Sequence, residues 1–259
     1  MTAVHVTGDV HGHVDKLRGL LRRCALIDDN DDWTGAESRL WFVGDLVNHG
    51  PNGVGAVDLV MRLQRQAAAA GGMVDTLLGN HDVVLLGAAR LGDRQAPGAN
   101  KTFRQIWRES GGVPEDLDRL TDAHVAWLCG RPVMAHEGDC LLLHADAPFY
   151  AHHGGSIAET NAAIADILQG EEPARWARLL EVFGEHGAFV AAVGGSEAAD
   201  AFLRRFGGER IVHGHTPVSK MTGHPPETVV EPLLYAGGRC LDVDAGMYLG
   251  GPGFVCQMA

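Results

Sequence analysis

Short apolar runs alternate with helical patterns over the first third of the chain. The runs Val4–Thr7, Leu40–Val43 and Met73–Leu78 have the length and composition of buried strands. A polar loop with glycine follows each run, and apolar residues then recur at helical spacing. The helical stretches span residues 14–24, 54–70 and 83–91. This repeated order predicts an α/β sheet whose loops converge on one edge.

The pattern changes after Leu91. Residues 92–135 carry helical pieces, including one over 117–128, and residues 151–206 are mostly helical. Strands return at Cys140–Leu143 and Arg210–Val212. Further short strands are predicted at residues 229–230, 233–235, 239–243 and 254–255. We therefore predict a single domain over residues 1–259, with helical cap-like insertions at about 92–135 and 151–206.

Composition narrows the class of protein. The chain has 259 residues, 46% of them hydrophobic, and a formal net charge of -12. This charge argues against nucleic-acid or anionic-membrane partners. The chain contains no run of 18 apolar residues and no signal-like start, so neither a transmembrane helix nor a signal peptide is expected. The five cysteines are scattered without a Cys-x-x-Cys pair, which favours reduced thiols and a cytoplasmic location.

Metal-ligand residue types gather at the ends of the predicted strands. The loop Gly44–Gly50 places Asp45 directly after the second strand, and three other strand ends carry Asp, Asn or His. Carboxylate, amide and imidazole ligands without a thiolate suit Mn, Fe or Zn. The six candidates are too many for one tetrahedral ion and indicate two ions that share a carboxylate. The candidate ligands are Asp9, His11, Asp45, Asn80, His144 and His215.

These residues stand in five motifs that follow one another along nearly the whole chain. The motifs span Gly8–Gly12, Gly44–Gly50, Gly79–Asp82, His144–Ala145 and Gly214–Pro217. In this order they resemble the calcineurin-like metallophosphoesterase superfamily and, within it, bacterial-type phosphoprotein phosphatases. The segments 44–51 and 79–82 are also similar to symmetrical diadenosine tetraphosphatases of the same family.

The resemblance implies a fold and a ligand assignment. The implied fold is a four-layer αββα sandwich of two mixed β-sheets flanked by helices. One ion would be bound by Asp9, His11 and Asp45. The other would be bound by Asp45, Asn80, His144 and His215, with Asp45 as the bridge. The implied cofactors are two divalent transition-metal ions, of which Mn fits best and Fe or Zn are alternatives.

The resemblance also implies a mechanism of in-line attack by a metal-bound hydroxide on phosphorus. His81 would protonate the leaving oxygen, and Asp45 is counted with it as catalytic because it bridges the ions. Asn80, His49 and Arg178 are the candidate contacts to the substrate phosphate. Arg178 follows Trp176 as a phosphate-binding arginine does in the family, although a surface position on a helix explains it equally well.

Asn48 and His49 depart from the family pattern, which has Asp and Arg at these positions. Asn48 offers no negative charge to His81, and His49 cannot form the planar bidentate contact that arginine makes with phosphate. We expect weaker phosphate capture and an activity optimum shifted toward acid. The remaining histidines, among them His213 and His186, are predicted to be structural or surface residues.

Three functions remain open from the sequence. The first is a phosphatase acting on phosphate monoesters, similar to serine/threonine protein phosphatases, with a phosphorylated small molecule or a phosphoprotein as substrate. The second is a symmetrical hydrolase of dinucleoside polyphosphates such as diadenosine tetraphosphate. The third is a regulatory module whose metal site has weakened catalytically, which the change at Asn48 favours and the complete ligand set opposes. The sequence leaves the oligomeric state open.

Overall fold

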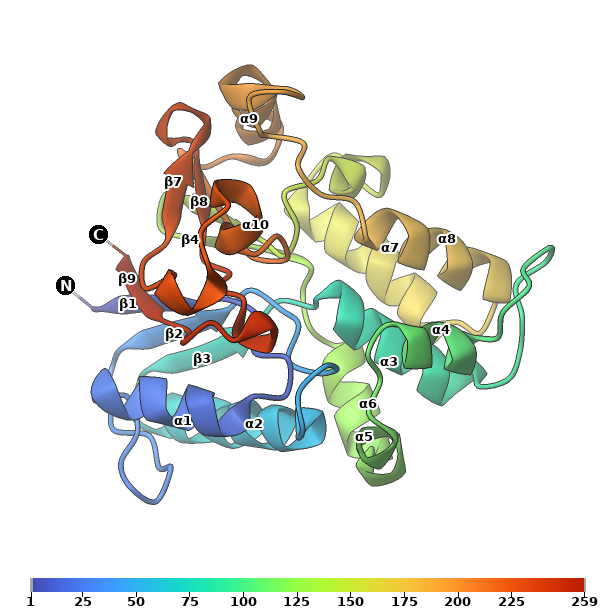
Figure 1. Cartoon of the computed structure of the whole chain (residues 1–259), viewed down its shortest axis with the longest axis horizontal. Coiled ribbons are helices and arrows are strands. Elements are labelled where there is room, and N and C mark those ends of the chain that lie inside the picture. The colour runs from blue at the N-terminus through green and yellow to red at the C-terminus, as the bar shows by residue number, and fades with distance from the viewer. Residues whose placement is uncertain (1, 259) are drawn as a thin grey trace.

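Two β-sheets packed face to face form the centre of the protein, as seen in a computed structural model that describes residues 2–258 (Figure 1). The first sheet has the order β3-β2-β1-β9. Its strands are β1 (Val4–Thr7), β2 (Arg39–Phe42), β3 (Met73–Thr76) and β9 (Val255–Met258). The first three run parallel, and β9 pairs antiparallel with β1. The chain ends therefore lie side by side on this sheet.

The second sheet has the order β4-β5-β6-β8-β7. Its strands are β4 (Met134–Glu137), β5 (Cys140–Leu143), β6 (Arg210–His213), β7 (Leu233–Tyr235) and β8 (Cys240–Asp242). Strands β5, β6 and β8 are parallel, and the two edge strands are antiparallel to their neighbours. Strand β4 was not predicted, because its residues mix apolar, small and charged types. The predicted strand at residues 229–230 is wrong, since Val230 is 67% exposed and the segment pairs with no described strand.

Alternation along the strands explains why each sheet is covered on both faces. In β2, Leu40 and Phe42 pack in the large core cluster with the helices, whereas Trp41 packs in a smaller cluster between the sheets. In β5, Leu142 joins the cluster between the sheets and Leu141 joins the outer one. Strands buried on both faces require a layer on each side. The predicted four-layer sandwich of two mixed sheets is thus confirmed.

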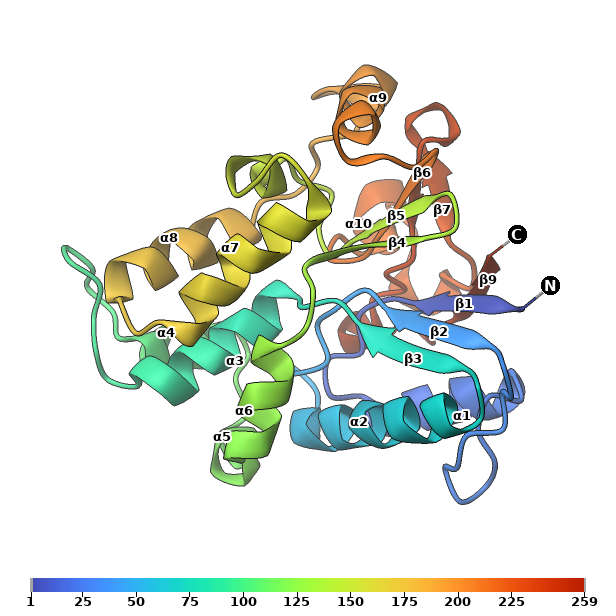
Figure 2. The same ribbon diagram turned by 180° about the vertical axis from the view of Figure 1, so that it is seen from behind.

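Helices α1 (Val14–Arg23) and α2 (Gly53–Ala69) cover the outer face of the first sheet (Figures 1 and 2). Helix α9 (Gly195–Phe206) contacts β6 of the second sheet. The other helices are α3 (Asn80–Leu91), α4 (Phe103–Glu109), α5 (Pro114–Arg119), α6 (Asp122–Cys129), α7 (Ile157–Gln169), α8 (Pro173–Phe183) and α10 (Val218–Thr222). Four short 3₁₀ turns are η1 (Phe149–His152), η2 (Pro226–Thr228), η3 (Ala236–Gly238) and η4 (Met247–Leu249).

Apart from α9, the helices of the two predicted insertions pack with α3 beside the sheets. Helix α3 contacts α4, α6 and α8, and α7 contacts α6 and α8 (Figure 2). The single helix predicted over residues 117–128 is divided into α5 and α6, because the Thr121 hydroxyl accepts the His124 N–H and starts a new helix there. The role of these helices as a cap stays a prediction. None of the helices within residues 2–258 combines the length and apolar composition needed to cross a bilayer.

Backbone hydrogen bonds tie together the loops that leave the strands. The amides of Val10 and His11 donate to the Asp45 carbonyl at 3.0 and 2.9 Å, which joins the loops after β1 and β2. The Gly214 amide donates to the His144 carbonyl at 2.9 Å, which joins the loops after β6 and β5. The predicted convergence of these loops at one edge therefore has a direct structural basis.

Asp116 on α5 fastens the helical group to α2, because its buried carboxylate accepts the N–H groups of Gly53 and Val54 at 3.1 and 2.9 Å. The change Asp116→Asn would turn an N–H₂ group toward one of these donors. We expect it to lower the free energy of unfolding by about 1–2 kcal/mol. Urea denaturation measures the loss, with Asp118→Asn on the exposed side of the same helix as the control. A loss no larger than that of the control would show that this cap does not stabilise the fold.

Candidate metal centre

The structure brings all six predicted ligands to one place at the loop edge. Asp9 and His11 lie in the loop after β1, and Asp45 lies in the loop after β2. Asn80 begins α3, and the two remaining histidines follow β5 and β6. Three groups of potential ligands form, and two of them contain Asp45. These two are Asp9, His11 and Asp45, and Asp45, His144 and His215, whereas the third is His11, His49 and His81.

In the first group, His11 faces two carboxylates. Its Nε2 lies 3.8 Å from Asp9 Oδ2 and 3.7 Å from Asp45 Oδ2. Its Nδ1 lies 3.1 Å from the Val47 carbonyl, an acceptor, so Nδ1 carries the ring proton. Burial lowers the pKa of His11 well below its usual value, and the ring is neutral. Its Nε2 therefore presents a lone pair to the two carboxylates.

The second group has the same arrangement. The Nδ1–H of His144 donates to the Val43 carbonyl at 2.9 Å. Burial also lowers the pKa of His144, which leaves Nε2 as a lone pair. This nitrogen lies 3.5 Å from Asp45 Oδ2 and 2.9 Å from Asn80 Oδ1. His215 Nδ1 lies 3.0 Å from the same Asn80 oxygen.

The donor set fits divalent cations because the Nε2 lone pairs of His11 and His144 converge with carboxylate and amide oxygens. Burial raises the pKa of both Asp9 and Asp45. Repulsion from the buried Asp244 and from Asp45 raises the pKa of Asp9 further. Asp242 and Asp244 each keep one buried oxygen without a hydrogen-bond partner in residues 2–258. A cation in each group would offset this negative charge, and oxygen and imidazole ligands suit Mn, Fe or Zn.

Strained backbone holds the ligand loops. Five non-glycine residues of the site have φ between 46° and 69°, a region that costs energy and recurs at functional sites. These residues are His11, Asp45, Asn48, His49 and His215. Two glycines permit the close approach of the loops. A Cβ at Gly79 would lie 2.1 Å from Asp45 Oδ1, and one at Gly214 would lie 2.2 Å from Asp9 Oδ1.

Asp82 holds the Asp45 loop against the start of α3. Its fully buried carboxylate accepts the backbone N–H groups of Asp45, Leu46 and Gly79, each at 3.0 Å. The backbone N–H of His81 in turn donates to Asp45 Oδ1 at 2.8 Å. The sequence analysis gave Asp82 no role, although an acidic residue at the third position of a helix is a known capping signal.

Asn48 fixes the orientation of the predicted general acid, His81. The Trp107 indole N–H, which can only donate, lies 3.0 Å from Asn48 Oδ1. The Asn48 amide N–H₂ therefore points to His81, whose Nδ1 lies 3.1 Å away. Nδ1 accepts this hydrogen bond, and the ring proton lies on Nε2. Burial, with repulsion from His49 and His215, lowers the pKa of His81 to about 3, while the Ser110 carbonyl acts in the opposite direction.

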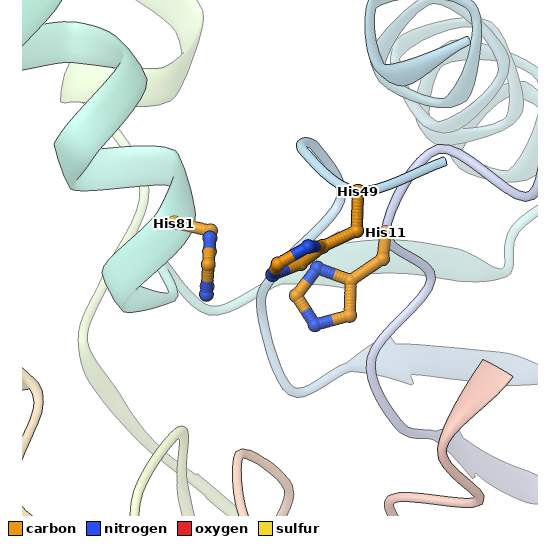
Figure 3. A group of neighbouring side chains, drawn as sticks. All are labelled: His11, His49 and His81. Carbon is orange, nitrogen blue, oxygen red and sulfur yellow. The ribbon is translucent and has the colours of Figure 1, made fainter. Parts of the chain in front are cut away.

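His49 lies in a cluster of aromatic rings beside His81. Figure 3 shows the rings of His11, His49 and His81 meeting from the loops after β1 and β2 and from the start of α3. The ring centre of His49 is 4.8 Å from that of His81 and 5.0 Å from that of His11. On its other side, His49 stacks on Tyr248 at 4.6 Å with an interplanar angle of 18°. This stacking holds the ring of an exposed residue beside the metal ligands.

A cavity of about 230 Å³ opens over the ligands. Five predicted residues line it and so face the same space: His11, Asp45, Asn80, His81 and His215. Among the other lining residues, Lys220 and Tyr248 received no role from the sequence, and His186 was predicted to be a structural or surface residue. They lie in loops and short helices whose placement depends on tertiary packing, and no local motif marks them.

Arg178 is the predicted phosphate contact that the structure does not bring to the site. It lies on α8 and lines a different cavity, together with His152 and His153. His213, predicted to be structural, is fully buried beneath the metal ligands, with Nε2 2.8 Å from the Tyr235 hydroxyl.

Comparison with known proteins agrees with this geometry. The model of the calcineurin-like phosphoesterase family matches residues 2–219. A symmetrical bis(5'-nucleosyl)-tetraphosphatase of Dechloromonas aromatica is 35% identical over 143 residues, which are 55% of this chain and 43% of that protein. The enzyme of the same name from Azotobacter vinelandii is 32% identical over 188 residues, 67% of this chain and 59% of that protein. The chain thus spans about half the length of these relatives.

Among solved structures, a cold-active protein-tyrosine phosphatase of a psychrophilic Shewanella species superimposes with a TM-score of 0.72. The match covers 98% of this chain and 74% of that protein, at 22% sequence identity. At this identity the likeness concerns the fold, and it agrees with the two packed sheets described above.

The Trp107–Asn48–His81 arrangement predicts the tautomer of His81. In zinc-loaded protein, ¹⁵N NMR of the histidine rings should show His81 protonated at Nε2 and unprotonated at Nδ1. The change Asn48→Asp should place a proton on Nδ1, because a carboxylate accepts where the amide donated. Asn52→Asp, in the same loop region but at the cap of α2, is the control. An Nδ1–H signal for His81 in the unchanged protein would contradict the assignment.

Proposed function

The chain belongs to the calcineurin-like phosphoesterase family, and we propose that its site hydrolyses phosphate esters and anhydrides with two bound divalent metal ions. One observation carries the proposal: two groups of ligands share the buried carboxylate of Asp45. The family uses divalent metal ions, and the proposed ions are Mn, with Fe or Zn as alternatives. The complete ligand set also opposes the third hypothesis, a metal-binding module without turnover.

Different residues of the chain have different roles around the ions. When bound, the ions would hold a phosphoryl oxygen and make a water molecule nucleophilic near neutral pH. Asp45 would contribute to both metal sites, and Asp82 and the His81 amide fix its loop and its carboxylate. Asn80 orients one ligand oxygen toward His144 and His215 and also faces the substrate cavity.

In this proposal His81 acts on the leaving oxygen of the substrate as a hydrogen-bond donor. Its Nδ1 accepts from Asn48, so Nε2–H is the one ring donor and the ring lines the cavity. The bond from phosphorus to the leaving oxygen breaks as the bond to the water oxygen forms. His81 then donates a hydrogen bond to the leaving oxygen, and the proton of the water passes to solvent. A neutral imidazole stabilises charge on that oxygen but transfers its proton reluctantly.

A neutral donor favours substrates whose leaving oxygen is already acidic. Phosphoanhydrides release a phosphate, which needs no proton near neutral pH, and the matched relatives are named for cleavage of such substrates. Dinucleoside polyphosphates are therefore the first candidate substrates. Phenolic phosphate monoesters are the second, because a phenolic oxygen is also acidic. Serine and threonine phosphates release an alkoxide and fit this donor least.

Metal content tests the shared carboxylate. Carefully loaded protein should approach two ions per chain by elemental analysis. Asp45→Asn should weaken both sites and reduce the content below one ion, because this carboxylate belongs to both ligand groups. Asp118→Asn is a matched change on an exposed surface and should retain both ions. A native content that stays at one ion, or full content in the Asp45 variant, would rule out the shared arrangement.

Turnover tests the substrate class and the role of His81. With Mn²⁺ added, the protein should hydrolyse diadenosine tetraphosphate and p-nitrophenyl phosphate faster than a phosphoserine peptide. His81→Ala should keep the metals and lose about 10- to 100-fold in kcat, the usual effect of losing one hydrogen bond to a charged oxygen. Faster hydrolysis of the phosphoserine peptide would reverse the proposed preference. Unchanged turnover in the variant would remove His81 from the reaction.

A further inference from the structure

Lys220 is the one lysine or arginine among the residues that line the substrate cavity. It lies on α10, next to the loop that supplies His215, and it is exposed. Within residues 2–258 its ammonium makes a single hydrogen bond, to the Tyr248 hydroxyl at 3.3 Å. Neither residue belongs to the ligand groups, and neither has a role in the reaction described above.

Tyr248 is held rigidly for this contact. Its ring stacks on His49 and meets the edge of His11 at 4.8 Å. The turn η4 that carries it is flanked by Gly246 and Gly250, both in left-handed conformations. Because three elements fix the ring, the hydroxyl has a defined position at the rim of the cavity.

The pair presents only donors to a ligand. The ammonium donates one N–H to the tyrosine oxygen and keeps two for other acceptors. The tyrosine hydroxyl, having accepted from Lys220, has its own hydrogen free to donate. Two neighbouring donors with a positive charge match an anionic oxygen pair such as that of a phosphate.

The position of the pair indicates which phosphate it meets. His81 serves the leaving oxygen, and its ring adjoins His49, which stacks on Tyr248. Lys220 and Tyr248 therefore lie on the same side of the cavity as His81, where the leaving group departs. A chain with a net charge of -12 would otherwise repel a highly anionic leaving group.

We propose that Lys220, oriented by Tyr248, binds a phosphate within the leaving group and thereby selects substrates with a phosphoanhydride chain. The proposal rests on the function inferred above and names a specificity residue for it. A lysine acts here as a single charge on a flexible stem, so it can follow a phosphate chain as the chain departs. Lys220 also supplies a positive charge on the side of the cavity that carries His49, where the family pattern has an arginine.

Lys220 has an alternative, purely structural explanation. Its charge acts on the buried carboxyl of Asp244. Burial raises the pKa of Asp244 to about 7 although the Gly246 N–H and Lys220 act in the opposite direction. A lysine that only balances Asp244 would support the metal ligands equally for every substrate. The two explanations therefore differ in substrate dependence and in metal content.

The test compares Lys220→Met with the native protein on diadenosine tetraphosphate and p-nitrophenyl phosphate. The KM for diadenosine tetraphosphate should rise about 10- to 100-fold, the usual effect of losing a hydrogen bond from a charged group. The KM for p-nitrophenyl phosphate should rise much less, because its leaving group has no phosphate. Lys220→Arg should restore part of the difference, and Tyr248→Phe should lose part of it. Lys101→Met, on an exposed surface outside the cavity, is the matched control.

Calorimetric titration of metal-loaded protein with ADP measures the same contact without turnover. Lys220→Met should weaken ADP binding by a similar factor and leave the metal content unchanged. Unchanged ADP affinity, an equal rise in KM for both substrates, or loss of metal would each overturn the proposal. If the native protein hydrolyses neither substrate, the proposed function fails, and the ADP titration still decides the role of Lys220.

Discussion

The convergence of buried ligand atoms on the carboxylate of Asp45 is the constraint on which the site depends. His11 and His144 each donate their Nδ1–H to a backbone carbonyl, so each turns an unprotonated Nε2 toward Asp45. The carboxylates of Asp9 and Asp244 add negative charge that burial makes costly. Cations among the ligands would offset this charge, and the carbonyls that accept the Nδ1–H groups orient the histidines to receive them.

The fold holds the ligands in place despite the repulsion between their buried carboxylates. Strands covered on both faces give a rigid support, and the loops at their ends are tied by backbone hydrogen bonds and by the Asp82 carboxylate. Left-handed backbone at His11, Asp45 and His215 stores strain where the ligands are needed. Gly79 and Gly214 let the loops approach to distances that any side chain would prevent. Stability elsewhere in the molecule thus compensates for a strained and charged centre.

Sequence patterns predicted the features that depend on neighbouring residues. Short apolar runs and strand-end motifs predicted most of the sheet strands, the family and the six ligands that the structure brings together. Features that depend on tertiary packing escaped prediction. Strand β4 has no clear alternation, and Lys220 and Tyr248 reach the cavity from two short elements that carry no motif. The motif-based choice of Arg178 placed it at the substrate, whereas α8 directs it to another cavity.

Anomalous diffraction from crystals grown with Mn²⁺ tests the central claim most directly. The account predicts two anomalous peaks that flank the Asp45 carboxylate, one within reach of Asp9 and His11 and the other within reach of His144 and His215. A single peak would contradict the shared carboxylate. So would two peaks of which one lies away from Asp45, for example among His11, His49 and His81.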